Sequence, residues 1–406
     1  MMALTAKMKI YDRLHTAHDG PYTACDGKLF ERRQKAHCES FMNAIIFTIK
    51  KMSNPIYLNT AACGLVMPET LVAANQLYAG FEHNSSTRSE EWRMRVEGRI
   101  RQAIADFVGA EARSIAMVPN FSWAWNGIVQ SLKGSERVLL FKRDYPSLLE
   151  PFRINHFDIT WVDAPDGFNI DLDAVTKAIS NKQVDIVALS HVLWSSGYKT
   201  DIKAIGDLCR QHGVLFMVDA TQSMGANEID LAQLNIDVFA ASNYKWMNAG
   251  FGTAVLFIAD GFLEKYQPVV GGHNSYKMVN GVMQYTPSVQ SYEPGHPNMY
   301  GLTVLESAIK HKMGLGVANI QNHNYSLAQK FLLGIEDLPV KILGDYSMNH
   351  RTAIVLLKDE EGLGDYIKKH NIVVTQRNGL LRVSMHYYNT AEDVQVLVDC
   401  LKEKYK

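Results

Sequence analysis

Short β-rich runs alternate with amphipathic helical stretches along most of the chain, and this alternation constrains the fold more than any single motif. The strand-like runs cover residues 114–118, 137–141, 159–163, 184–190, 214–218, 237–241 and 254–258. Helical periods precede the first run, at 69–83 and 90–108, and fill most later gaps, as at 122–133, 171–180 and 202–211. Strands that alternate with helices form a mostly parallel sheet covered on both faces. The sequence therefore predicts an α/β fold that binds its ligand at the carboxyl ends of the strands.

The C-terminal part of the chain follows a different pattern. Helical periods lie near 301–313, 320–334, 361–370 and 391–403, and short strand-like runs lie near 340–343, 352–356, 372–374 and 380–384. This mixture predicts a smaller α+β domain. Because 406 residues exceed the usual size of one domain, we expect a large domain over 52–300 and a small one over 301–406.

Residues 1–51 show no sustained helical or strand period. Their one short apolar run, 41–47, is interrupted by Asn43, and no small-residue cleavage site follows it. These features argue against a secretory signal. We interpret residues 1–51 as an N-terminal extension that is either disordered or mis-annotated, with translation beginning at Met52.

The composition argues against several classes of function. The formal net charge is −1 and no long run of one sign occurs, so we expect neither nucleic acid nor an acidic membrane surface as a partner. No apolar stretch is long enough to span a membrane. The 5 cysteines form no Cys-x-x-Cys pair, and the 14 histidines lack metal-ligand spacing. We therefore expect no metal site, no disulfide framework and a cytoplasmic location.

Asp219 and Lys245 follow two neighbouring apolar runs. Asp219 comes directly after 214–218, and Lys245 follows 237–241 by a short loop. A carboxylate and an amine at adjacent strand ends suit pyridoxal 5'-phosphate, because the aldehyde needs a lysine for a Schiff base and the pyridine nitrogen needs an acid to stay protonated. Taken singly, Asp219 is as readily a helix cap and Lys245 a solvated surface charge.

Four further residues follow strand ends near this pair. Ser122 lies at the predicted amino end of a helix, which favours a phosphate, although a simple N-cap is an equal alternative. Tyr145 is either a ring that stacks on a planar cofactor or a turn tyrosine. Gln222 comes three residues after the aspartate, and Ser242 three before the lysine. We predict that Gln222 reaches the phenolic oxygen of the ring and that Ser242 joins the phosphate shell.

The segment 190–197 also follows a strand end. It brings hydroxyl groups, His191 and Trp194 toward the same edge of the sheet. For His191, a buried histidine with satisfied hydrogen bonds is as good an interpretation as a site residue. We therefore treat the segment as a candidate wall of the site.

Arg382 lies inside an otherwise apolar strand, between Leu381 and Val383. A buried guanidinium needs an anion, since an unpaired buried charge is costly. Its planar fork suits the carboxylate of a substrate. An inter-strand ion pair with a protein Asp or Glu is the alternative.

Taken in order, these segments resemble the class V aminotransferases among the fold type I pyridoxal-phosphate enzymes, a group that also holds the cysteine desulfurases, isopenicillin N epimerase and kynureninase. The likeness runs from 57–62 to 388–393. It implies a mostly parallel seven-stranded sheet sandwiched by helices, with a smaller α+β C-terminal domain. It also implies that Lys245 is the Schiff-base lysine, Asp219 the partner of the pyridine nitrogen and Gln222 the partner of the phenolic oxygen.

The resemblance assigns the remaining contacts as well. Those to the phosphate and the ring fall on Phe121, Ser122, Ser242 and Tyr145. Those to the substrate fall on Arg382, which binds its carboxylate, and on Asn59. The substrate is accordingly expected to be a small molecule with an amino group.

The resembled family is generally dimeric, and each site is completed by the neighbouring chain. Residues 271–276 and 293–297 resemble the segments that cross over. The usual Gly-Thr after the crossover is Gly295-His296 here, so His296 stands where a cofactor contact from the partner chain is expected. The resemblance therefore implies a homodimer with shared active sites.

An aminotransferase is the function that the resemblance favours, with the substrate held by Arg382 and a proton removed from its Cα by Lys245. A lyase or epimerase stays open, because 244–250 leans toward kynureninase and isopenicillin N epimerase, although the chain lacks kynureninase's Ala-Pro-Val-Pro sequence. Sulfur transfer is disfavoured, since no cysteine lies between 209 and 400, where a desulfurase carries its mobile cysteine.

Two readings from other classes are weaker. A nicotinamide-dependent oxidoreductase would need a Gly-x-Gly-x-x-Gly motif, which the chain lacks. A non-catalytic interaction protein of the same fold fits poorly with the retention of Lys245, Asp219 and Arg382.

Overall fold

The computed structural model describes residues 55–164, 166–344, 347 and 349–406. The expected N-terminal extension, 1–51, lies outside the described residues. Contacts group Ile56–Lys406 into one unit. The boundary expected near residue 300, between a large and a small domain, stays a prediction.

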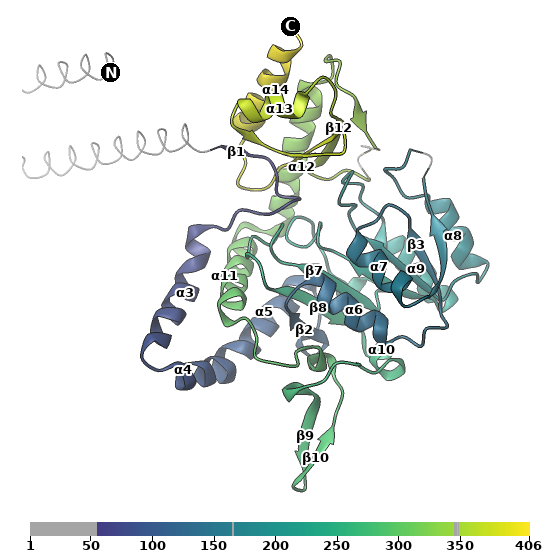
Figure 1. Cartoon of the computed structure of the whole chain (residues 1–406), viewed down its shortest axis with the longest axis vertical. Helices are drawn as coiled ribbons and strands as arrows, with labels where there is room; N and C mark the ends of the chain where they lie inside the picture. The colour runs from purple at the N-terminus through teal and green to yellow at the C-terminus, as the bar shows by residue number, and fades with distance from the viewer. Residues whose placement is uncertain (1–54, 165, 345–346, 348) are drawn as a thin grey trace, which may run out of the picture. The chain divides into compact units, whose positions relative to one another are not determined.

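A seven-stranded sheet forms the centre of this unit (Figure 1). In sheet order its strands are β2 (Ile115–Val118), β8 (Ala254–Ile258), β7 (Val238–Ser242), β6 (Leu215–Asp219), β5 (Ile186–Ser190), β3 (Arg137–Phe141) and β4 (Asp158–Val162). In this sheet β8 runs antiparallel to both of its neighbours, and the remaining pairs are parallel. The predicted mostly parallel α/β sheet is confirmed, and each predicted run lies within two residues of an observed strand.

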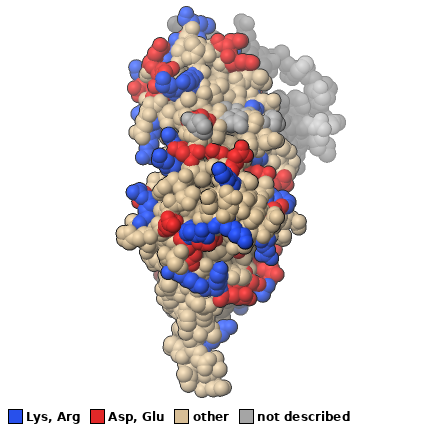
Figure 2. Space-filling model, turned by 90° about the vertical axis from the view of Figure 1, so that its right-hand side faces the viewer, with Lys and Arg blue, Asp and Glu red and all other residues tan. Residues whose placement is uncertain are grey.

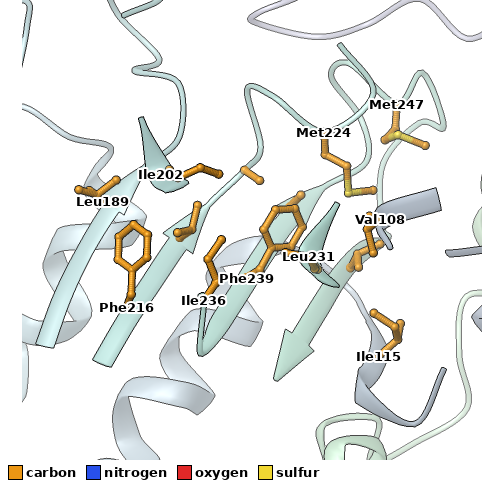
Figure 3. Close-up of a cluster of buried hydrophobic side chains, with 14 of the residues drawn as sticks. Val108, Ile115, Leu189, Ile202, Phe216, Met224, Leu231, Ile236, Phe239 and Met247 are labelled. Carbon is orange, nitrogen blue, oxygen red and sulfur yellow. The ribbon is translucent and has the colours of Figure 1, made fainter. Parts of the chain in front are cut away.

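Helices cover both faces of the sheet (Figure 1). One face carries α5 (Gly98–Val108), α8 (Leu172–Ser180), α9 (Ile202–His212) and α11 (Met299–Leu315), and the other carries α6 (Phe121–Ser131), α7 (Pro146–Ile154) and α10 (Asp260–Lys265). Alternate strand residues enter the two cores, so Phe216 packs on the first face and Met217 on the second. Figure 3 shows part of the first core, with Phe216 and Phe239 on the same face of the sheet. Because both faces are buried, the strands are continuous apolar runs.

Several elements differ from the sequence-based expectation. Ahead of the sheet, the helix predicted over 69–83 is confirmed as α3 (Pro68–Ala79), which packs against α11. The helix predicted over 90–108 is divided, because α4 (Ser85–Trp92) passes through a π-helical segment, Arg93–Glu97, before α5 begins. Neither α7 nor the hairpin of β9 (Tyr276–Val279) and β10 (Val282–Tyr285) was expected.

A four-stranded antiparallel sheet forms the C-terminal part, in the order β11 (Ile342–Leu343), β12 (Ile354–Lys358), β15 (Leu380–Ser384) and β14 (Thr375–Arg377). Helices α12 (Val317–Gly334), α13 (Leu363–Lys369) and α14 (Ala391–Lys404) pack with it around a third core. Asn378 and Gly379, with φ of 52° and 72°, form the two-residue turn between β14 and β15. A parallel pair, β1 (Ile56–Tyr57) with β13 (Ile372–Val373), joins the start of the described chain to this part.

Charged side chains of both signs are interspersed over the face that Figure 2 shows. The tip at its lower end, formed by β9 and β10, carries few of them. Throughout the described ranges, no helix combines the length and apolar character that a membrane crossing needs. The same residues include no cluster of His, Cys, Asp and Glu that could hold a metal ion.

Candidate active site

The carboxyl ends of β5, β6 and β7 open onto one cavity. Its lining includes seven of the residues predicted for the site, namely Phe121, Ser122, Tyr145, Asp219, Gln222, Ser242 and Lys245. Parallel strands present their carboxyl ends at one edge of a sheet, which brings together residues far apart in the sequence. Arg382, Asn59 and His296 do not line this cavity.

Lys245 lines the cavity in a turn that follows β7, and it is only 6% exposed. Among the described residues its Nζ makes no hydrogen bond and lies 5.4 Å from the centre of the Tyr145 ring and 5.6 Å from that of Tyr244. Burial lowers the pKa of Lys245 to about 8; the charge of Asp219 opposes this shift and that of Arg382 reinforces it. An amine with such a pKa is readily neutral, as a nucleophile or a base must be.

The backbone of Lys245 is held against the segment that follows β1. The amide of Gly64 donates a hydrogen bond to the carbonyl oxygen of Tyr244 at 2.9 Å. A Cβ atom at position 64 would lie 1.9 Å from the carbonyl oxygen of Lys245, so this close approach requires glycine. Cys63 lies beside the same loop, with its Sγ 3.6 Å from the oxygen of Tyr244.

Asp219 is the last residue of β6 and is 5% exposed. Its Oδ1 accepts a hydrogen bond from the amide of Thr221 at 2.8 Å. Burial raises the pKa of Asp219 to about 6, although the hydrogen bonds from Thr221 and the charge of Lys245 oppose the shift. A cation placed beside this carboxylate would therefore be favoured, because it would compensate the buried charge.

Hydrogen-bond donors gather at the amino end of α6. Asn120 caps the helix by accepting a hydrogen bond from the amide of Trp123 at 2.8 Å. The amide of Phe121 donates to Oγ of Ser242 at 3.0 Å, and Oγ of Ser122 donates to Oγ of Ser147 at 2.8 Å. Asp219 is the only acid in the described lining, so this end of the cavity has helix-terminal N–H groups and hydroxyls without a carboxylate.

Gln222 and Tyr145 are both fixed by tryptophans. Gln222 donates from Nε2 to the carbonyl oxygen of Ala61 at 2.9 Å and accepts from Nε1 of Trp246 at 2.6 Å. Tyr145 meets Trp194 edge to face, with 5.9 Å between ring centres. The sequence suggested Trp194 as a wall of the site, but no sequence signal pointed to the contact between Trp246 and Gln222.

Arg382 lies behind Trp194, on β15, and is 7% exposed. Its guanidinium donates to the carbonyl oxygen of Trp194 and, at 3.4 Å, to Oγ1 of Thr375. Thr375 in turn donates to Oδ1 of Asn59 at 2.6 Å. The alternative of an inter-strand ion pair is not found, because no Asp or Glu among the described residues lies within 4.0 Å of Arg382.

Two histidines lie away from the cavity. His296 lines two other hollows, one beside Trp123 and one beside His273. His191 is buried and lines a further cavity with Lys199; its Nδ1 has no hydrogen-bond partner among the described residues. Burial lowers the pKa of His191 to about 3. His191 is thus a buried neutral histidine that lines a different cavity from Trp194.

A family model of the class-V aminotransferases matches residues 56–397. Among curated proteins, a probable cysteine desulfurase of Pyrococcus abyssi is 24% identical over 380 residues, which cover 86% of this chain and 94% of the relative. An uncharacterized aminotransferase of Bacillus subtilis, YcbU, is 24% identical over 328 residues, which cover 78% of this chain and 86% of the relative. The resemblance found in the motifs is thereby confirmed.

Solved structures share the fold. The apo cysteine desulfurase of Thermococcus onnurineus NA1 has a TM-score of 0.77 and 22% identity, and the match covers 86% of this chain and 94% of that one. A C-DES variant with glycine covalently linked to its PLP cofactor has a TM-score of 0.78 and 19% identity, and the match covers 87% of this chain and 97% of that one. At these identities the structures support the fold, and the reaction has to be argued from the residues.

Proposed function

The chain belongs to the class-V aminotransferase family of pyridoxal-phosphate enzymes, and from this premise we propose that it transfers the amino group of a small amino acid or related amine to a keto acid. In this proposal Lys245 forms the Schiff base with the cofactor. The observation that carries the proposal is that one amine, with a lowered pKa, is the only lysine or histidine in the described cavity lining.

The phosphate of the cofactor would lie at the amino end of α6. Ser242 has a hydroxyl there, and the amide of Phe121 and the hydroxyl of Ser122, which now donate to Ser242 and Ser147, would donate to phosphate oxygens in their place. The described lining carries no acid at this end that would repel a phosphate. His296 would contact the phosphate of the other copy in a homodimer.

The ring would lie between β6 and Tyr145. Asp219, whose buried carboxylate favours a neighbouring cation, would hold the protonated pyridine nitrogen. Gln222 uses one N–H of its amide for Ala61, so the second N–H is available for the phenolic oxygen. When bound, pyridoxal phosphate supplies an aldehyde that condenses with amines and a ring that withdraws electrons from Cα.

A single base distinguishes amino transfer from epimerisation. Lys245 is the only lysine or histidine in the described lining. Amino transfer needs one group that takes a proton from Cα and returns one, on the same face, to the carbon that comes from the aldehyde of the cofactor. Epimerisation needs proton transfer on both faces, and besides Lys245 the described lining offers tyrosine hydroxyls in place of a second amine or imidazole; burial raises the pKa of one of them, Tyr244, to about 12, which makes it a poor proton donor.

Arg382 would bind the carboxylate of the substrate, with Asn59 as a neighbour through Thr375. A buried guanidinium without an acidic partner is stabilised by a bound carboxylate. The substrate's own charge would then orient it for proton removal.

Desulfuration, the activity named for several relatives, fits this chain less well. No cysteine lies between 209 and 400. Cys63 lies beside the loop of Lys245, but burial raises the pKa of its thiol, whereas sulfur transfer needs a mobile thiolate. We therefore propose amino transfer in preference to sulfur transfer.

A homodimer with shared sites is part of the proposal. The β9–β10 hairpin projects from the sheet (Figure 1) and exposes large apolar side chains that a second copy would cover, namely Met278, Val279, Val282, Met283 and Tyr285. Cys209 and Cys400 are buried thiols without a disulfide, which supports a reducing compartment and so a cytoplasmic location.

A screen of amino donors tests the reaction. The cofactor-loaded enzyme is mixed with one ¹⁵N-labelled amino acid at a time and a keto acid, and ¹⁵N in the new amino acid is measured by mass spectrometry. We expect transfer from at least one donor, with its loss in Lys245→Ala and its retention in Lys265→Ala, a control at an exposed lysine of α10. Cleavage of a donor into smaller fragments, or inversion at Cα without transfer, would refute amino transfer in favour of a lyase or an epimerase.

A further inference from the structure

The hairpin of β14 and β15 presents two arginines on one face. In its antiparallel register Thr375 lies opposite Arg382, and Arg377 lies opposite Leu380. Directly opposite residues share a face, as do residues two apart on a strand. Arg377 and Arg382 are therefore diagonal neighbours on the same face of the sheet.

This face is turned toward Trp194, which lines the cavity of Lys245. Cζ of Arg377 lies 5.8 Å from the centre of the Trp194 ring, and Cζ of Arg382 lies 6.0 Å from it. Trp194 also meets Tyr145, whose ring lies 5.4 Å from Nζ of Lys245. The exposed Arg377 and the buried Arg382 thus both contact the tryptophan that forms part of the cavity wall near Lys245.

Neither guanidinium has an acidic partner within 4.0 Å in the part of the chain that the structure describes. Arg382 has a buried Nε without an acceptor, and the buried Nε1 of Trp194 also lacks one. Burial, with a contribution from the charge of Arg377, lowers the pKa of Arg382 to about 10. The wall that these three side chains form is rich in N–H donors and positive charge and poor in acceptors.

An arginine stacked on an indole is common on protein surfaces and needs no ligand. Arg377 differs from that case because it shares its face with a second guanidinium, which repels it. Arg382 and Trp194 beside it also each have a buried N–H donor without an acceptor. A wall of this kind is complementary to a ligand with more than one anionic group.

We propose that the substrate is an amino acid with a second anionic group, a carboxylate or a phosphate, which Arg377 binds while Arg382 binds the α-carboxylate. This inference rests on the proposed function, because it assigns the substrate class of the same site. Arg377 is then a specificity residue that selects the acidic side chain and takes no part in proton transfer. Amino acids with neutral side chains bind without the Arg377 contact.

Calorimetric titration of the cofactor-loaded enzyme tests the inference without turnover. The probes are succinate, 3-phosphonopropionate and the singly charged butyrate. We expect at least one doubly charged probe to bind about 10-fold to 100-fold more tightly than butyrate, as one charge-assisted contact provides. Arg377→Gln should remove that advantage and leave the affinity for butyrate within about twofold, and Arg377→Lys should restore part of it.

A matched control is Lys369→Gln, which removes an exposed positive charge from α13 and should leave all three affinities unchanged. Equal affinities for butyrate and both doubly charged probes, or an equal loss for all probes in Arg377→Gln, would overturn the inference. The tighter of the two doubly charged probes identifies the second group as carboxylate or phosphate. If the Arg377-dependent preference is present but no ¹⁵N transfer occurs, the proposed reaction is wrong and the binding class is still supported.

Discussion

Lys312 of α11 is a second buried amine, outside the catalytic cavity and 1% exposed. Its Nζ lies 3.3 Å from the carbonyl oxygen of Gly225, 2.9 Å from Oδ1 of Asn248 and 3.1 Å from Nε2 of His386. Burial lowers its pKa well below the ordinary value. The ring of Tyr387, 4.4 Å away, favours the cation, but a fully buried charge without a carboxylate costs more than one aromatic contact contributes.

The neutral form of Lys312 satisfies all three polar contacts. Two N–H groups donate to Gly225 and Asn248, and the lone pair shares the Nε2–H of His386 with two oxygen atoms 3.0 Å from Nε2, the carbonyl oxygen of Trp246 and Oδ1 of Asn248. The other ring nitrogen, Nδ1, then accepts from Nδ2 of Asn324 at 3.2 Å. We infer that Lys312 is neutral in the folded protein and that it joins the loop after Lys245 to the C-terminal part.

This protonation state predicts a pH dependence of stability. The unfolded chain keeps a proton on Lys312 up to its ordinary pKa of 10.5, whereas the folded chain has lost it at lower pH. The unfolded state therefore binds more protons, so the free energy of unfolding rises with pH toward that value. Lys312→Met should reduce the slope between about pH 8 and pH 10, measured by urea denaturation of the cofactor-free protein.

Lys330→Met, at an exposed lysine of α12, is the matched control and should keep the wild-type slope. Lys245 contributes a slope of the same sign, because its pKa is also lowered, but it is present in all three proteins. An unchanged slope in Lys312→Met would show that Lys312 is protonated in the folded protein.

At the scale of elements, strands could be predicted and some connections could not. β6 and β7 are buried on both faces, so continuous apolar runs mark them. The sequence did not predict α7 because this helix contains Pro151, and proline inside a helix removes a hydrogen bond and is normally a helix breaker. The β9–β10 hairpin had a usable signal in Asn280-Gly281, whose φ of 51° and 77° suit a two-residue hairpin turn.

The sequence predicts the site residues that directly follow neighbouring strands, and it does not predict the contacts that depend on how loops pack. Asp219 and Lys245 follow neighbouring strands, so parallel pairing brings them to one edge. The hydrogen bond from Trp246 to Gln222 depends on how the loops pack, and no local pattern encodes it. The sequence does not indicate the role proposed for Arg377, because that role depends on the register of β14 with β15.

The β9–β10 hairpin supplies a prediction at this scale. Met278 and Val282 are 60% and 61% exposed, and we expect a second copy to bury them. The double substitution Met278→Asp and Val282→Asp places two charges in that apolar contact and should weaken dimerisation at least about 100-fold. Sedimentation equilibrium measures the dissociation constant.

Val396→Asp, at a residue of α14 that is 44% exposed, is the control and should leave dimerisation unchanged. A wild-type protein that stays monomeric at micromolar concentration would contradict the proposed shared sites. So would a hairpin variant that dimerises as tightly as the wild type.

At the scale of the whole molecule, the loop of Lys245 is fixed by all three cores. Ala241 and Met247 belong to the first core, Ala240 to the second and Trp246 to the third. The polar contacts come from equally distant parts of the chain, such as Gly64. The amine is therefore held in position by the complete fold, which is what a reaction at a fixed cofactor requires.

Covalent mapping of the cofactor tests the central claim most directly. The purified protein is saturated with pyridoxal phosphate near pH 8, where Lys245 is about half neutral, reduced with borohydride, and digested for mass spectrometry. We predict one phosphopyridoxyl group per chain, on the peptide that contains Lys245, and no such group in Lys245→Ala. A label on Lys199 or Lys312 in place of Lys245, or no label at saturating cofactor, would contradict the account.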